Sequence, residues 1–229
     1  MNLSFETCRR YVFLLLIVSI MESFCLQEQK SLKYLPLGDS YTICTGATEK
    51  ESWPVLLSAH LNNAGIKTTL LGNPARNGYS TQNLIDTELP ELKKLKPDLV
   101  TLLIGVNDWV RQVPATTFKE NLISILNEVQ KELPVKSRIV LITIPDFGVT
   151  PEGKNYGSGR DISKGISSFN DIIKEEAKKR NLPVVDIFET SKKMKGDKSL
   201  VAADGLHPSA KEYALWETLI LPVVKKTVQ

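Results

Sequence analysis

The sequence predicts an α/β protein in which a five-stranded parallel sheet lies between two layers of helices. Short apolar runs, without the alternation of a half-exposed strand, indicate strands that are covered on both faces. Between these runs, apolar residues recur at steps of three and four, which is the spacing of a helix with one buried face. Strands that alternate with helices imply right-handed crossovers, so we expect a three-layer α/β/α sandwich.

Five segments have the composition of strands, and the clearest is 99–104, whose sequence is LVTLLI. The expected strands are 32–35, 67–71, 99–104, 138–144 and 182–187. Two helical stripes are formed by Phe118, Leu122, Ile125, Val129 and Leu133, and by Ile162, Ile166, Phe169, Ile173 and Ala177. A final helix is expected over 210–221, because Pro222 should bend or end it.

A candidate nucleophile follows the first expected strand, in the stretch 38–42 with the sequence GDSYT. Gly38 leaves room for a tight turn, and Ser40 at the carboxyl end of a strand is well placed to be exposed to a ligand. The alternative is that Asp39 or Ser40 only forms hydrogen bonds within a turn. The stretch alone does not decide between these interpretations.

The chain has two histidines, and only one of them has the surroundings of a catalytic base. His207 lies in a loop with Asp204 three residues before it, so the carboxylate can accept from one ring nitrogen while the other nitrogen faces a serine. The alternative is a turn-forming Asp beside a surface His. His60 lies on an expected helix, and we interpret it as a packed or half-exposed helix residue.

Four blocks of the chain together resemble the conserved blocks of the SGNH (GDSL-type) hydrolases. They are 38–42 (GDSYT), 77–81 (NGYST), 105–108 (GVND) and 204–208 (DGLHP), in the order of the family and over essentially the whole chain after its first residues. The resemblance implies a flavodoxin-like strand order, 2-1-3-4-5. It also implies an esterase or lipase-like enzyme that uses no cofactor.

The resemblance assigns roles to the residues in these blocks. Ser40 is the expected nucleophile, His207 the base, and Asp204 the residue that orients His207. The Ser40 N–H, the Gly78 N–H and the Asn107 side-chain amide are the expected oxyanion donors. Asn107 can instead be a turn former, and Gly78 can serve only to provide a positive φ.

The leading hypothesis is therefore an exported serine hydrolase that cleaves carboxylic esters through an acyl-enzyme on Ser40. Lipid-like esters, thioesters and acetyl groups on sugars are possible substrates within this class. One competing hypothesis is a non-catalytic binding protein on the same scaffold, and another is an electron carrier that binds flavin. The last would need a phosphate-binding loop after the first strand, and the GDSYT stretch supplies only part of one.

The residues that follow the third and fourth strands are candidates for the substrate pocket. Trp109 comes directly after the Asn107 block and is expected to line the pocket or to pack beneath it, and Phe147 is a second candidate. The segment 146–160 is long and glycine-rich at its end. It is either a lid over the pocket or a surface excursion.

Residues 1–25 have the pattern of a signal peptide. Arg9 and Arg10 precede an apolar run, and small residues precede Leu26 in the manner of a cleavage site. Cys25 as a lipidated cysteine is the alternative. Removal of the leader leaves roughly 200 residues, enough for one domain over 26–229.

The composition limits the remaining classes of function. The net charge of +3 is too small to suggest a nucleic-acid partner. Cys44 is expected near the site, in a loop or at a helix start, and not as a nucleophile. No cluster of side chains has the spacing of metal ligands, so no metal is expected. The oligomeric state stays open.

Overall fold

The computed structural model describes residues 31–229, and the five expected strands form one parallel sheet in the order β2-β1-β3-β4-β5. The strands are β1 (Leu32–Gly38), β2 (Thr68–Leu70), β3 (Leu99–Leu103), β4 (Ile139–Ile142) and β5 (Val184–Val185). The fold class and the strand order are thereby confirmed. The strand order reverses at β1, and in open parallel sheets the crevice at such a reversal is where ligands bind.

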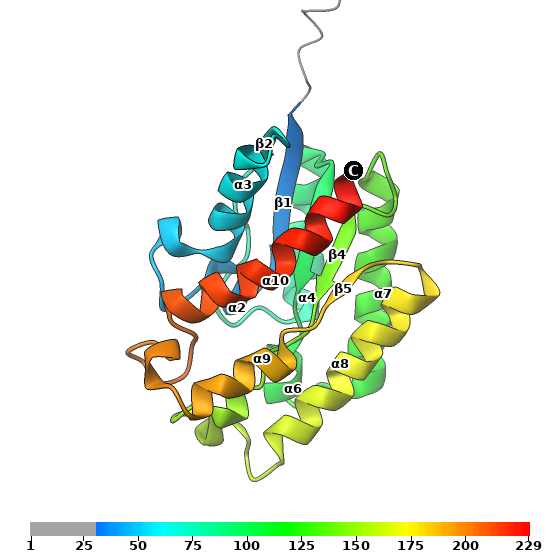
Figure 1. The fold of residues 1–229 in the computed structure, drawn as a ribbon. Helices are drawn as coiled ribbons and strands as arrows, with labels where there is room; N and C mark the ends of the chain where they lie inside the picture. Colours follow the sequence, from blue (N-terminus) through cyan, green and yellow to red (C-terminus); the bar gives the residue numbers. More distant parts are fainter. Residues whose placement is uncertain (1–30) are drawn as a thin grey trace, which may run out of the picture. The chain divides into compact units, whose positions relative to one another are not determined.

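Helices cover both faces of this sheet, as Figure 1 shows. Helices α3 (Trp53–Asn63) and α10 (Ala210–Val228) pack against each other, and α10 also contacts β4 and β5. Helix α7 (Ala115–Glu132) lies between α5 (Leu89–Leu95) and α8 (Ile162–Lys179). The shorter helices are α2 (Ser40–Ile43), α4 (Thr81–Asn83), α6 (Val106–Val110) and α9 (Phe188–Ser191).

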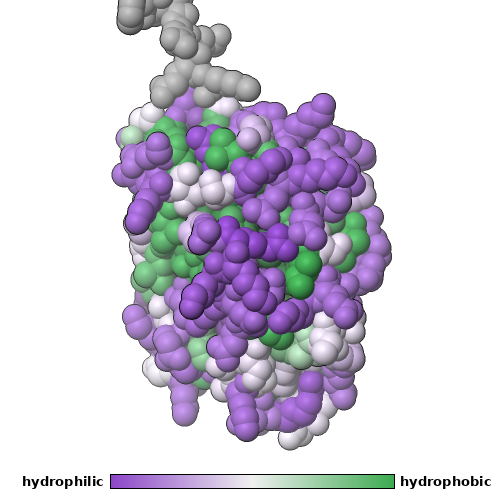
Figure 2. Space-filling view, turned by 90° about the vertical axis from the view of Figure 1, so that its right-hand side faces the viewer, coloured by the Kyte–Doolittle hydropathy of each residue, from purple (hydrophilic) through white to green (hydrophobic). Residues whose placement is uncertain are grey.

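The helical stripes expected from the sequence lie in the core. Phe118 of α7 and Phe169 of α8 stack with ring centroids 4.4 Å apart, and both side chains are buried. The outward faces of these helices are polar. Figure 2 looks onto the side of the molecule where α7 and α8 lie, and hydrophilic side chains cover most of its centre. Lys119 of α7 and Glu175 of α8 form an ion pair between the two helices, with Nζ and Oε2 3.4 Å apart.

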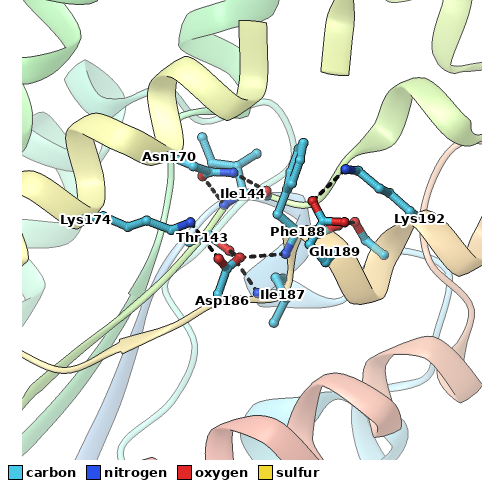
Figure 3. A network of polar contacts seen from close by, with 10 residues as sticks. Thr143, Ile144, Asn170, Lys174, Asp186, Ile187, Phe188, Glu189 and Lys192 are labelled. Atoms are coloured by element: carbon cyan, nitrogen blue, oxygen red, sulfur yellow. Dashed lines mark hydrogen bonds and ion pairs between the residues drawn. The ribbon is translucent and has the colours of Figure 1, made fainter. Parts of the chain in front are cut away.

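Strands β4 and β5 are shorter than the sequence predicts. Beyond their carboxyl ends, the backbone bonds to polar side chains instead of to the neighbouring strand (Figure 3). The Asn170 side chain accepts from the Ile144 N–H at 2.7 Å and donates to the Ile144 carbonyl at 2.9 Å. Asp186 accepts from the Thr143 hydroxyl and from the Phe188 N–H, and it pairs with Lys174 at 2.6 Å. These bonds direct the chain away from the sheet.

Two expectations about the ends of the chain have different outcomes. Helix α10 does not end at Pro222 but continues to Val228. Val224 is fully buried on the same helix, so packing of this last turn outweighs the hydrogen bond that a proline removes.

The predicted leader, 1–25, lies outside the described residues. Within residues 31–229 no helix has both the length and the apolar character needed to cross a membrane.

Candidate active site

A cavity of about 200 Å³ lies at the carboxyl end of the sheet and brings together four of the residues expected to form the catalytic centre and the oxyanion hole. Ser40, Gly78, Asn107 and His207 all line it, although they are far apart in the sequence. The other lining residues are Tyr41, Asn77, Val106, Val110, Phe147, Tyr156 and Leu206. The cavity therefore combines a few polar groups with mainly apolar walls, as small-molecule sites do.

Ser40 is the first residue of α2, directly after β1. Asp39 caps this helix, because its Oδ1 accepts from the Tyr41 N–H at 3.0 Å. Gly38 permits the close passage of β1 beside β3, since a Cβ at this position would lie 2.1 Å from the Leu103 carbonyl oxygen. The N–H of Ser40 has no acceptor within its own helix, because the first helical N–H groups never do. It is thus available to a ligand oxygen.

Asp204 and His207 form a hydrogen-bonded pair, and His207 lines the same cavity as Ser40. Asp204 Oδ2 lies 2.6 Å from His207 Nδ1, and Asp204 Oδ1 accepts from the backbone N–H groups of Leu206 and His207, each at 2.9 Å. Because Asp204 occupies Nδ1, the other ring nitrogen, Nε2, is left for the cavity. Partial burial opposes the charge of Asp204, but these hydrogen bonds outweigh it and hold its pKa below the ordinary value.

Asn107 reaches the cavity from the first turn of α6, which follows β3. One N–H of its side-chain amide donates to the Tyr79 carbonyl at 2.9 Å. The amide carries a second N–H, which this bond leaves for another acceptor. Gly78 lies in the neighbouring segment with φ +79°, a conformation that glycine adopts without strain.

Three carboxyl groups are buried behind Ser40 and the segment that carries Gly78. Burial raises the pKa of Asp39 to about 8, and burial likewise raises the pKa of Glu88 to about 8. Glu88 Oε2 accepts from the Gly38 N–H at 3.0 Å. Asp108 accepts from the N–H of Thr81 at 2.9 Å and from its hydroxyl at 2.5 Å, while burial raises its pKa. These acids support the loops and do not line the cavity.

The structure also shows where four other residues considered in the sequence analysis lie relative to the cavity. Phe147 lines the cavity, whereas Trp109 packs behind it, with the two ring centroids 6.0 Å apart. His60 lies away from the cavity, and its Nδ1 is 3.0 Å from Glu217 Oε1. Cys44 lies in the turn directly after α2, which agrees with the loop position and not with the helix start, and it is 1% exposed. Burial raises the pKa of its thiol, which disfavours the thiolate that a nucleophile requires.

The segment 146–160 contributes Phe147 and Tyr156 to the cavity. The Glu152 N–H donates to the Gly205 carbonyl at 3.0 Å, so the segment is joined to the loop that carries Asp204 and His207.

Sequence reasoning did not single out Tyr156, although an aromatic residue within a glycine-rich stretch was an available signal. Glu88 was also missed, and its local sequence carries no sign of a role. Among residues 31–229 no group of acids, histidines and cysteines could hold a metal ion.

Comparison with known proteins identifies the class of this fold and site. The family model of the GDSL-like lipase/acylhydrolases matches residues 37–215, which is most of the chain. The chain therefore belongs to this family and is a GDSL-type carboxylic ester hydrolase.

Three relatives illustrate the similarity. An arylesterase of Vibrio mimicus is 28% identical over 195 residues, which cover 84% of this chain and 88% of the relative. A multidomain esterase of Ruminococcus flavefaciens is 27% identical over 221 residues, and here the chain spans only 27% of the relative's length. The crystal structure of the lipase/acylhydrolase from Enterococcus faecalis superposes with a TM-score of 0.70 at 26% identity, covering 85% of this chain and 96% of that one.

Proposed function

We propose that this chain is an exported serine esterase that works through an acyl-enzyme on Ser40. The observation that carries the proposal is the convergence of Ser40, Gly78, Asn107 and His207 on one small cavity, with Asp204 bonded to the far side of the His207 ring. A nucleophile, a base, an orienting acid and oxyanion donors are the parts that acyl transfer needs.

In the first half of the reaction, the Ser40 hydroxyl attacks the carbonyl carbon of the ester while its proton passes to His207 Nε2. The carbonyl oxygen becomes an oxyanion, which accepts from the Ser40 N–H, the Gly78 N–H and the second N–H of the Asn107 amide. Asp204 stabilises the imidazolium that forms on His207. When the bond to the alcohol oxygen breaks, His207 returns the proton to that oxygen, and the acyl group stays on Ser40.

The second half repeats these steps with water. His207 takes a proton from a water molecule whose oxygen attacks the acyl carbon, and the same three donors hold the oxyanion. Collapse of this intermediate breaks the bond to Ser40, and the proton returns to the serine oxygen. One ester and one water thus become one carboxylic acid and one alcohol.

The cavity favours esters with a short acyl chain. Its volume of about 200 Å³ is below the roughly 300–1,000 Å³ of sites that enclose drug-sized ligands. Its apolar walls, formed by Val106, Val110, Phe147 and Leu206, suit a hydrocarbon chain and not a charged one. We expect kcat/KM to be highest for acetyl to butyryl esters in a series of p-nitrophenyl esters and to fall for octanoyl esters.

Labelling with a fluorophosphonate tests the mechanism most directly, because such probes phosphonylate an activated serine. Mass spectrometry should locate the label on Ser40, and Ser40→Ala should abolish both labelling and ester hydrolysis. A label on another residue, or an unlabelled enzyme that hydrolyses esters, would refute the acyl-enzyme. Export is tested separately by N-terminal sequencing of the protein recovered outside the cytoplasm, which should begin near Leu26.

A further inference from the structure

The segment that contains Gly78 has little regular structure of its own. Residues 71–76 have no regular structure, and a turn follows at 77–78. The turn is closed by a bond of 3.2 Å from the Tyr79 N–H to the Arg76 carbonyl. A glycine with positive φ in such a segment has many accessible conformations, so its oxyanion role requires support from elsewhere.

That support comes from α6. Arg111, at the end of this helix, donates from Nη2 to the Gly78 carbonyl at 2.6 Å and from Nη1 to Asn83 Oδ1 at 3.2 Å. Asn107, four residues earlier and therefore on the same side of α6, donates to the next carbonyl, that of Tyr79. Two successive carbonyls of the Gly78 segment are thus held by one short helix.

The bonds of Arg111 are not those of an ordinary helix cap. A capping arginine would bind the last carbonyls of its own helix, but in α6 another residue does this. Arg160 donates to the Trp109 carbonyl at 2.8 Å and to the Val110 carbonyl at 3.2 Å, and its guanidinium lies 3.8 Å from the centroid of the Trp109 ring. The helix is held by Arg160, so Arg111 is available to hold the neighbouring segment.

We propose that Arg111 is a positioning residue, which fixes the Gly78 peptide so that its N–H points at the developing oxyanion. The inference rests on the proposed function. By holding the carbonyl of Gly78, the guanidinium fixes the peptide plane on one side of the Gly78 Cα, and this restrains the turn from which the N–H on the other side points. The guanidinium of Arg111 also connects the turn to Asn83. Asn83 Oδ1 is itself held in place, because it accepts from the Ser80 N–H at 3.1 Å. Arg111 itself is exposed and does not line the cavity.

The test compares the steady-state kinetics of Arg111→Ala and Arg111→Met with those of the wild type on p-nitrophenyl acetate. Misplacement of a catalytic group by about 1 Å can cost roughly a hundredfold in rate, so we expect kcat to fall by about 10- to 100-fold. KM should change by less than about threefold, because the donor acts on the transition state and not on the bound ester. The rate of labelling by a fluorophosphonate should fall by a similar factor, because the phosphonyl oxygen uses the same donors.

Two further variants separate positioning from general damage. Arg111→Lys keeps one donor for the Gly78 carbonyl and should recover part of the lost kcat. Arg138→Ala is the matched control, since Arg138 also donates to a backbone carbonyl, that of Val228 at 3.3 Å, but it lies directly before β4 and does not line the cavity. It should leave kcat unchanged.

The outcomes distinguish this inference from the proposed function. If the wild type is labelled at Ser40 and Arg111→Met keeps a kcat within twofold of it, the positioning role is wrong while the mechanism stands. The role is also wrong if Arg111→Lys is as slow as Arg111→Met, or if Arg138→Ala slows the reaction equally. If the wild type hydrolyses no ester, the proposed function itself fails.

Discussion

Glu88 offers a quantitative test of how the buried acids affect stability. Its side chain is fully buried, and Oε1 has no hydrogen-bond partner among the described residues. Burial raises its pKa to about 8, and the charge of Asp39 raises it as well, while the bond from the Gly38 N–H and the charge of Arg76 lower it. Glu88→Gln keeps the size of the side chain and an acceptor for Gly38 but removes the ionisation.

The direction in which stability changes with pH follows from the pKa of Glu88 in the folded and in the unfolded chain. The ordinary pKa of 4.5 applies to the unfolded chain, so between pH 4.5 and about pH 8 the folded protein holds a proton that the unfolded chain has lost. The free energy of unfolding therefore falls as pH rises through this window, by about 1.4 kcal/mol per pH unit for each such group. Asp39 adds a slope of the same sign, because its pKa is also raised to about 8.

We expect the wild type to lose stability more steeply than Glu88→Gln between pH 5 and pH 8. The difference between the two proteins reports Glu88 together with its coupling to Asp39 and should amount to roughly 3 to 4 kcal/mol over this interval. Urea unfolding followed by tryptophan fluorescence measures it, since Trp53 and Trp216 are fully buried. Glu120→Gln, at an exposed position of α7, controls for the loss of one charge. Equal slopes in the wild type and Glu88→Gln would refute the reasoning.

The remaining predictions concern catalysis. His207→Ala should lower kcat/KM for ester hydrolysis by several orders of magnitude, whereas His60→Ala should leave it nearly unchanged; equal losses in two folded variants would contradict the assignment of the base. Asn107→Ala should lower kcat by roughly 10²–10³-fold with a smaller change in KM. If Asn107 only forms a turn, its loss should instead lower Tm and leave kcat near that of the wild type. EDTA should not change the rate, and recovery of a chelated enzyme by zinc would contradict a metal-free mechanism.

The sequence by itself determined the fold class and singled out Ser40, Gly78, Asn107 and His207, which line one cavity. Apolar runs such as 99–104 mark strands buried on both faces, and a parallel sheet places all their carboxyl ends at one edge. The blocks around Ser40, Gly78 and Asn107 each follow a strand, so their convergence was predictable from topology. Asp204 and His207 were readable as a pair because they are only three positions apart.

Only the tertiary structure decided what surrounds these residues. Trp109 lies behind Phe147 and not in the cavity, because Arg160 and the ring of Phe147 hold it there. Helix α10 continues past Pro222, because packing of its buried face outweighs one lost hydrogen bond. The contact of Arg111 with Gly78 joins residues 33 positions apart. Local pattern cannot report such contacts, because they depend on how loops from different strands meet, and that is set by the packing of the whole chain.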